Sequence, residues 1–255
     1  MKNNSLFLIL FASILFSCVP AKDVVYFQGI DNANSTASVN YEPVIKADDI
    51  LYINVSTLDP KAAEPFNLGN TEGQGTGGAG GGVQLQRLTY LVKNDGTIQF
   101  PVLGTLKVGG LTKAEVTHMV SSRISEFAKD AVINIRIMNF KISVLGEVNS
   151  PGSFVITNER ITIPEALALA GDMTLFGKRE NILLIREVQG VKSTLRLDMT
   201  NPEIINSPYY YLTQNDVLYI EPNKRKINST AIGPNILAGI SILGFAITTV
   251  LLLTK

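Results

Sequence analysis

A long uncharged segment near the end of the sequence, residues 227–254, constrains this chain more than any other feature. Its apolar core, 236–253, would form about 27 Å of α-helix, close to the thickness of the hydrocarbon core of a bilayer. Basic residues stand on both sides of it, where they can reach the membrane interface: Lys224, Arg225, Lys226 and Lys255. A buried helix of a soluble protein would normally keep one polar face. The pattern therefore predicts a transmembrane helix over residues 233–254.

The beginning of the chain has the features of an export signal. Leu6 to Phe16 is an uninterrupted apolar run, too short to span a bilayer, and it ends at Ser17-Cys18. A small residue before the single cysteine of the chain is typical of a bacterial lipoprotein, so we expect residues 1–17 to be removed and Cys18 to carry the lipid. The alternative is a plain signal peptide with an incidental cysteine, which would leave that thiol without a partner.

The remaining sequence is nearly neutral and divides into two globular parts. Without Lys2 the 22 basic residues become 21, against 22 acidic ones, so the chain lacks the net positive charge that would attract nucleic acid. Residues 18–40 are polar and small and predict a tether, and the glycine-rich stretch 69–82 predicts a mobile loop. We expect domains at 41–139 and 140–222, together long enough for two small cores.

In the first part, alternation and capping signals predict β-strands around one helix. Leu51, Ile53 and Val55 share a strand face, and Gly96 closes an Asn-Asp-Gly turn that should join two paired strands. Thr112 and Glu115 form a capping box for an amphipathic helix over 113–128, with Phe127 on its apolar face. A strand over 131–137 follows.

The second part repeats this pattern. A strand over 142–148 leads to a turn at Pro151 and Gly152, where Gly152 is expected to adopt a positive φ, and pairing resumes at 153–156. A helix begins after Thr162 and ends at Gly171. Further strands are expected at 181–186, 193–197 and 211–220, and residues 211–220 resemble 45–53. Both parts are therefore of the α+β class.

The residues for catalysis or metal binding are scarce. The sequence has one histidine, His118, on the polar side of its predicted helix, and one cysteine, so we expect no metal or other cofactor. Glu147, Glu159 and Glu165 are candidates for the paired carboxylates of glycoside cleavage, but turn and capping roles explain them. The sequence predicts a protein that is not an enzyme.

Three motifs in the first part resemble the polysaccharide export domain of Wza-type outer-membrane translocons. They are Tyr41-x3-Ile45-Lys-Ala-Asp-Asp-Ile-Leu-Tyr-Ile-x-Val55, Asp95-Gly-Thr-Ile-x-Phe-Pro-Val-Leu-Gly104 and Val108-Gly-Gly-Leu-Thr112. In the second part, Val144-Leu-Gly-Glu-Val-x2-Pro-Gly-x-Phe154 and Ile163-x-Glu-Ala-Leu-x-Leu-Ala-Gly171 resemble the SLBB domain, a β-grasp module thought to bind soluble ligands.

This resemblance implies a subunit of a homo-oligomeric ring in the outer membrane of a Gram-negative bacterium. The ring would export capsular or exopolysaccharide as a passive conduit, lipid-anchored to the bilayer and linked to an inner-membrane polysaccharide co-polymerase. Its C-terminal helices would line a pore, for which the candidate pore-facing residues are Ala238, Ser241 and Thr248. Two alternatives remain: the helix is only an anchor, or the chain is a membrane-tethered, periplasmic carbohydrate-binding or scaffold protein that forms no pore.

Overall fold

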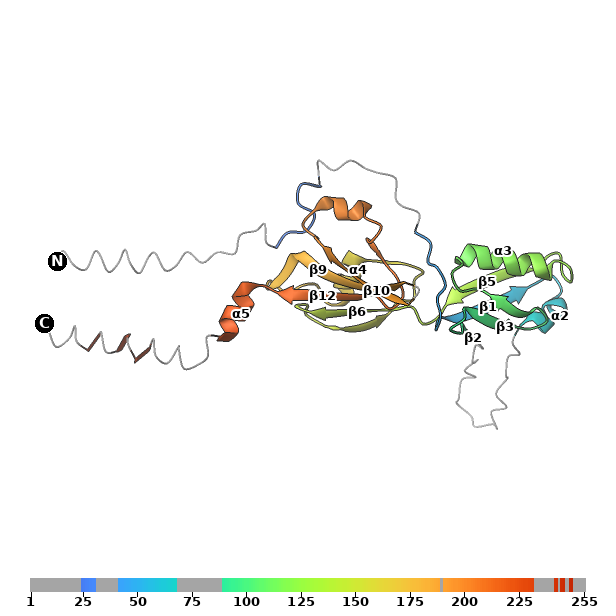
Figure 1. The fold of residues 1–255 in the computed structure, drawn as a ribbon, viewed down its shortest axis with the longest axis horizontal. Helices are drawn as coiled ribbons and strands as arrows, with labels where there is room; N and C mark the ends of the chain where they lie inside the picture. Colours follow the sequence, from blue (N-terminus) through green and yellow to red (C-terminus); the bar gives the residue numbers. More distant parts are fainter. Residues whose placement is uncertain are drawn as a thin grey trace, which may run out of the picture.

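Two α+β units with separate apolar cores make up the body of the protein (Figure 1). The computed structural model describes residues 24–30, 41–67, 89–188 and 190–231, and in addition 241–242, 244–245 and 248–249. The glycine-rich stretch 69–82 and Cys18 lie outside the described residues. The mixture of strands with few helices confirms the predicted α+β class.

The first unit, residues 41–138, is built on a three-stranded antiparallel sheet with β1 in the middle. Leu51, Ile53 and Val55 of β1 are buried, as their alternation predicts, and β5 runs antiparallel beside them. In chain order its elements are β1 (Ile50–Ser56), α2 (Pro60–Ala63), η3 (Glu64–Phe66), β2 (Tyr90–Leu91), β3 (Thr97–Phe100), β4 (Gly104–Lys107), α3 (Lys113–Ile124) and β5 (Val132–Ile137).

The helix α3 covers this sheet and begins where the capping box predicts. The Thr112 hydroxyl accepts a bond from the Glu115 amide, and the Glu115 carboxylate accepts one from the Thr112 amide. The helix ends at Ile124 rather than at 128, because a turn with a bond from the Ala128 amide to the Ile124 carbonyl replaces its last residues. Phe127, expected on the apolar face, is exposed as a result.

The turn at Gly96 is present, although the strands around it have other partners than expected. Gly96 has a φ of +75° and its amide donates to the Lys93 carbonyl at 2.7 Å. Beyond the turn, however, β3 pairs with β4 in a hairpin of its own, whereas β2 pairs with β1. The second turn, at 101–104, uses positive φ at Val102 and Gly104. This second turn brings β4 beside β3, so β3 pairs with β4 and not with β2.

The second unit, residues 140–222, is a mixed five-stranded sheet in the order β10-β9-β12-β6-β7. The last strand, β12, lies between the two hairpins, parallel to β6 and antiparallel to β9. Ile163, Ala166 and Leu167 of α4 are buried in the core of this unit. Its elements are β6 (Lys141–Gly146), β7 (Gly152–Val155), β8 (Ile161–Thr162), α4 (Ile163–Leu169), β9 (Gly177–Val188), β10 (Val191–Leu197), η4 (Pro202–Asn206), β11 (Tyr211–Leu212) and β12 (Val217–Pro222).

The left-handed glycine between β6 and β7 is not the one that we expected. Gly152 follows Pro151 as the first residue of β7, pairs with Val144 and has no positive φ, so that expectation is wrong. The positive φ lies at Gly146, at +92°, where β6 ends against β12. A Cβ atom there would stand 2.0 Å from the carbonyl oxygen of Ile220. Close approach of two strands therefore requires glycine at 146.

Part of the predicted tether is packed onto the second unit. Tyr26 and Phe27 lie against its core, and the Phe27 amide donates to the Met199 carbonyl at 3.0 Å. The Tyr26 hydroxyl donates to Asp172 at 2.6 Å. Residues 24–30 are therefore held in place, because their aromatic side chains gain contacts that a polar tether lacks.

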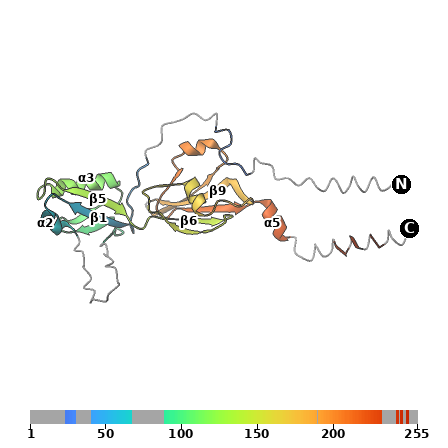
Figure 2. The same cartoon turned by 180° about the vertical axis from the view of Figure 1, so that it is seen from behind.

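A short helix, α5 (Lys224–Ala231), follows β12 at the end of the second unit that faces away from the first, as both views show (Figures 1 and 2). Among the residues that the structure describes, no helix has both the length and the apolar character needed to cross a bilayer. Most of the segment 233–254, including Ala238, lies outside them. Ser241 and Thr248 are described, exposed and helical, and the Thr248 hydroxyl donates to the Gly244 carbonyl at 2.8 Å.

Candidate functional site

Two acidic turns of the same design meet where the units join. Each precedes a strand, and each places an aspartate so that its carboxylate accepts the amide three residues earlier: Asp49 from Lys46 at 2.8 Å, and Asp216 from Thr213 at 2.7 Å. The residue before each aspartate, Asp48 or Asn215, has a φ of +65°. The similarity between residues 45–53 and 211–220 is thus also a similarity of backbone.

Side-chain amides connect these two turns across the junction. Asn139 donates to the Asp48 carbonyl at 2.9 Å and accepts the Ile50 amide at 2.9 Å. Gln214 in turn donates to the Asn139 carbonyl at 2.8 Å and accepts the Lys141 amide at 2.7 Å. Because Asn139 binds the backbone of the first turn and Gln214 binds the backbone of the connection between the units, the junction is fixed by hydrogen bonds.

The two aspartates differ in how their charge is compensated. Asp216 is fully buried and receives three bonds from Arg186, at 3.1, 3.1 and 2.6 Å. Asp49 is equally buried, yet its Oδ1 has no hydrogen-bond partner among the described residues. Burial raises the pKa of Asp49 to about 6, with the Lys46 amide and ammonium acting in the opposite direction. The junction therefore contains one carboxylate whose charge is compensated by Arg186 and one that is buried with an unpaired oxygen.

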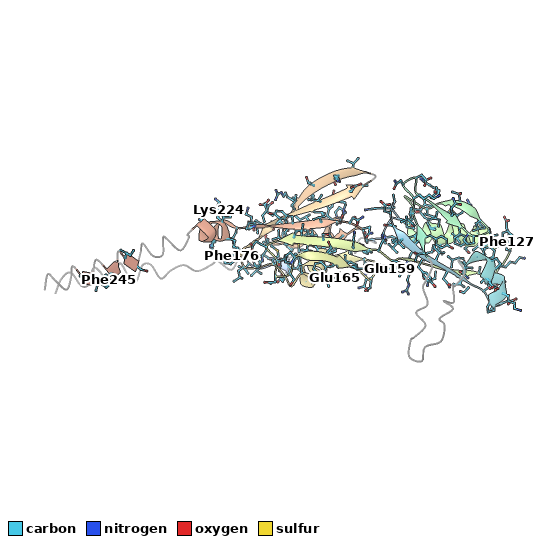
Figure 3. The ribbon with its side chains drawn as sticks, turned by 90° about the horizontal axis from the view of Figure 1, so that it is seen from below. Phe127, Glu159, Glu165, Phe176, Lys224 and Phe245 are labelled. Atoms are coloured by element: carbon cyan, nitrogen blue, oxygen red, sulfur yellow. The ribbon has the colours of Figure 1, made fainter. Side chains whose placement is uncertain are left out.

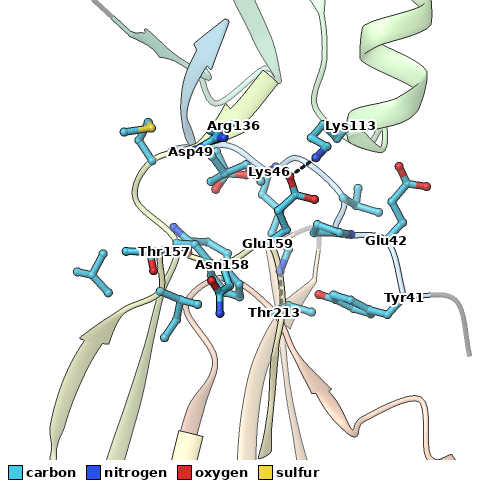
Figure 4. Close-up of a pocket in the computed structure, with 18 of the residues that line it drawn as sticks. Tyr41, Glu42, Lys46, Asp49, Lys113, Arg136, Thr157, Asn158, Glu159 and Thr213 are labelled. Atoms are coloured by element: carbon cyan, nitrogen blue, oxygen red, sulfur yellow. Dashed lines mark hydrogen bonds and ion pairs between the residues drawn. The ribbon is translucent and has the colours of Figure 1, made fainter. Parts of the chain in front are cut away.

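A groove lies along this junction and is lined by residues of both units (Figure 4). It consists of a cavity of about 640 Å³ and a neighbouring one of about 750 Å³. The two share part of their walls, namely Tyr41, Glu42, Pro43, Lys113, Asn158 and Glu159. An ion pair between Lys113 and Glu159 bridges the units across it. Cavities of this size accommodate small organic ligands.

A cluster of tyrosines forms one wall of the groove. Tyr41 stacks on Tyr211 with centroids 5.1 Å apart and an interplanar angle of 16°, and Tyr210 meets Tyr211 edge-on at 5.5 Å. The guanidinium of Arg160 lies over the Tyr211 ring at 5.4 Å. The Tyr41 hydroxyl donates to the Leu212 carbonyl at 3.2 Å, and burial raises its pKa to about 12. The wall thus offers aromatic surface held in a fixed orientation.

Charge along the groove is close to balanced. Five basic side chains and four acidic ones line the two cavities: Lys46, Lys113, Arg136, Arg160 and Arg186, with Glu42, Asp49, Glu159 and Glu165. The Lys46 ammonium lies at the junction itself, 3.2 Å from the Thr213 hydroxyl, and burial lowers its pKa. Such a surface suits a polyhydroxylated ligand better than a highly charged one.

The glutamates considered for glycoside cleavage are engaged in separate interactions. Glu159 pairs with Lys113, and Glu165 closes the capping box of α4 with Thr162. Glu147 accepts the Thr174 hydroxyl at 2.8 Å. Within the described ranges, no three histidine, cysteine or acidic side chains cluster as metal ligands would.

Of the tyrosines in the sequence, the fold brings Tyr41, Tyr210 and Tyr211 together and places Tyr90 elsewhere, stacked on Phe100 in the first core. Sequence reasoning did not find the contribution of Lys113 or Arg186. The resemblance between residues 45–53 and 211–220 marks Asp216 as part of a repeated turn, but it does not indicate which cation pairs with it.

Both parts of the chain match families of known proteins. Residues 37–138 match the family described as polysaccharide biosynthesis/export protein, and residues 140–220 match the SLBB domain. The chain is similar to the EPS I polysaccharide export outer membrane protein EpsA of Ralstonia nicotianae, with 32% identity over 136 residues, which are 52% of this chain and 35% of that protein. The same-named protein of Ralstonia solanacearum is 30% identical over 139 residues, 53% of this chain and 36% of the relative. The chain therefore spans about a third of the length of these relatives.

Proposed function

Since the chain belongs to the polysaccharide biosynthesis/export family, we propose that it is a subunit of an outer-membrane translocon for capsular or exopolysaccharide. It acts as a passive conduit and makes or breaks no covalent bond in the polymer. The observation that carries this proposal is the succession of an export domain and an SLBB domain over residues 37–220, in one body joined by hydrogen-bonded turns.

Two domains, 41–139 and 140–222, form the periplasmic part in this proposal. For the second domain the strand order supports a β-grasp module. Its two hairpins, β6-β7 and β9-β10, flank the last strand, which runs parallel to the first. The helix α4 connects the hairpins and packs on the sheet.

The groove is the surface that we assign to the polymer. Sugar rings present C–H groups on their faces and hydroxyls at their edges, so a fixed tyrosine wall beside mixed polar side chains suits them. Tyr211→Ala should weaken retention of the host polysaccharide by the detergent-extracted protein, because it removes the stacked pair with Tyr41. Tyr90→Phe, in the first core, is the matched control and should retain it. Equal retention by both variants would remove the groove from the proposal.

Membrane attachment is assigned to Cys18 and to the helix over 233–254. Cys18→Ala should abolish incorporation of a labelled fatty acid, since the chain has one cysteine only. Labelling equal to that of the parent would show that Cys18 is not the anchor.

The competing function is a membrane-tethered carbohydrate-binding or scaffold protein that forms no pore. The bond from Thr248 to its own helix at Gly244 favours it, because a hydroxyl satisfied in this way needs no water-filled lumen. Single cysteines at Ser241 or Thr248 should react with water-soluble thiol reagents if these positions line a pore, whereas cysteines at Leu243 or Ile247 should be protected. Equal protection at all four positions would leave the helix as an anchor only.

Stoichiometry distinguishes the conduit from the scaffold most simply. A conduit needs a closed ring of identical subunits, together with its inner-membrane co-polymerase partner, and a scaffold needs neither. Native mass measurement of the detergent-extracted complex should give one discrete multiple of the subunit mass. A monomer, or a broad series of masses, would contradict the translocon.

A further inference from the structure

The end of the second unit that faces away from the first carries an exposed surface that is both apolar and basic (Figure 3). Its apolar members are largely solvent-exposed: Leu175 at 63%, Ile227 at 55% and Phe176 at 38%. Three consecutive cations, Lys224, Arg225 and Lys226, lie at the start of α5, and Lys226 contacts the Phe176 ring. We refer to this surface, formed by Leu175, Phe176, Lys224, Arg225, Lys226 and Ile227, as the basic tip.

The loop that presents Leu175 and Phe176 is rigidly held from beneath. Arg179 is 3% exposed, and its guanidinium donates to the carbonyls of Thr174 and Gly177 at 3.2 and 3.1 Å. The Asn223 amide donates to the Phe176 carbonyl at 2.7 Å, and the Asn223 side chain accepts the Lys226 amide at 3.1 Å. Loop and helix thus form one fixed surface, because these hydrogen bonds hold the backbone in a conformation that leaves the apolar side chains exposed.

Two of the three cations of the basic tip, Lys224 and Arg225, have no carboxylate partner among the described residues. Both residues are exposed. Lys226 lies over the Phe176 ring at 5.3 Å and 3.8 Å from Glu147. Because the whole chain has a formal net charge of zero, this concentration of cations is a local feature.

Both ends of the described body lead to the basic tip. On the N-terminal side, Tyr26 donates to Asp172, three residues before Leu175, and its ring lies under Arg179 at 5.2 Å. From Val24 back to Cys18 six residues can span about 20 Å at most. On the C-terminal side, α5 itself leads toward residues 233–254. A lipid on Cys18 and a helix over 233–254 would therefore hold this same end near a bilayer.

We propose that the basic tip rests in the headgroup layer of the membrane, with Leu175, Phe176 and Ile227 inserted among the lipids and Lys224 and Arg225 against anionic phospholipid headgroups. Apolar side chains ringed by cations bind anionic membrane surfaces in this way. The inference rests on the membrane attachment proposed above. It adds that the second unit docks directly on the lipid instead of standing off at the end of a tether.

The absence of tryptophan from the chain gives a clean optical probe. Phe176→Trp places an indole in the basic tip, and Phe127→Trp places one at a more exposed site at the far end of the first unit. Each full-length variant is reconstituted into nanodiscs of phosphatidylcholine, with or without phosphatidylglycerol, and quenched by lipids brominated at shallow or deep positions. We expect blue-shifted emission and strong loss by shallow bromine for Phe176→Trp, greater with phosphatidylglycerol, and no loss for Phe127→Trp.

Charge removal tests the second half of the proposal. Adding Lys224→Gln and Arg225→Gln to the Phe176→Trp variant should abolish the extra quenching that phosphatidylglycerol causes. Lys61→Gln with Lys129→Gln, two exposed cations of the first unit, is the matched control and should leave it unchanged.

Other outcomes overturn the inference, and they separate it from the proposed function. If the protein co-elutes with the nanodiscs but the Phe176→Trp indole is unquenched and red-emitting, the attachment holds and the docking is wrong. Blue-shifted but unquenched emission would place another protein surface, such as a second copy of the chain, on the basic tip. Failure to co-elute with lipid would refute the attachment itself.

Discussion

Replacing Asp49 with asparagine should flatten the pH dependence of the protein's stability between about pH 4 and pH 7. Asp49 is 1% exposed, and only its Oδ2 is used, by the Lys46 amide at 2.8 Å. Burial raises its pKa from 3.8 to about 6. An asparagine would keep the carbonyl oxygen that accepts the Lys46 amide and would remove the charge.

The sign follows from which state holds the proton more tightly. Because the pKa of Asp49 is higher in the folded protein than in the unfolded chain, its contribution to stability is fully present below about pH 4 and is lost as the pH rises through about 6. A shift from 3.8 to about 6, at about 1.36 kcal/mol per unit, makes this loss about 3 kcal/mol. The loss reflects the burial of a carboxylate with one oxygen unpaired.

Chemical denaturation of the detergent-solubilised chain at a series of pH values, followed by circular dichroism, measures this directly. Between about pH 4 and pH 7 the parent should lose about 3 kcal/mol more than Asp49→Asn does. Glu126→Gln, which removes an exposed carboxyl of the same unit, should behave as the parent does. Identical pH dependence in the parent and in Asp49→Asn would refute the reasoning.

Two further substitutions test the packing of the second unit. Gly146→Ala should destabilise it by more than about 3 kcal/mol, because a positive φ is combined with a Cβ 2.0 Å from the Ile220 carbonyl. The control Gly104→Ala, at a φ of +71° with open space around it, should cost only about 1 kcal/mol. Equal unfolding midpoints for the two variants would contradict this account. Asp216→Asn should cost about 3–5 kcal/mol by leaving the Arg186 guanidinium without its carboxylate. Adding Arg186→Met should recover part of that loss of stability. No recovery would show that the unpaired Arg186 guanidinium is not the source of the loss.

Local sequence patterns predicted the individual elements well. The capping box at Thr112 places the start of α3, and alternation along 51–55 places the buried face of β1, because both signals depend on residues close in sequence. The end of α3 was predicted four residues too late, because Phe127 continues the apolar spacing of the helix although the helix ends at Ile124.

Strand partners and turn conformations were harder to predict. An Asn-Asp-Gly turn fixes a reversal but not which strands continue the sheet, and the positive φ at Val102 that gives β3 its partner has no sequence signal. Pro151-Gly152 is typical of a turn, yet the left-handed residue is Gly146, because the constraint comes from Ile220, which is distant in sequence.

The groove could not be predicted, because its contacts join distant parts of the chain. Tyr41 and Tyr211 stack across 170 positions, and Lys113 pairs with Glu159 across the junction. Periodicity assigns such residues to the surface of their own element. Only the repeated acidic turn hinted that residues 46–49 and 213–216 belong to one structure.

The central claim, passive export of a polysaccharide, is tested most directly by measuring where the polymer accumulates when this chain is removed from its host. The account predicts that extracellular polysaccharide falls sharply, that polymer of unchanged sugar composition and linkage is retained within the cell envelope, and that the parent chain restores secretion. Undiminished extracellular polymer, or secreted polymer with altered composition or linkage, would contradict it.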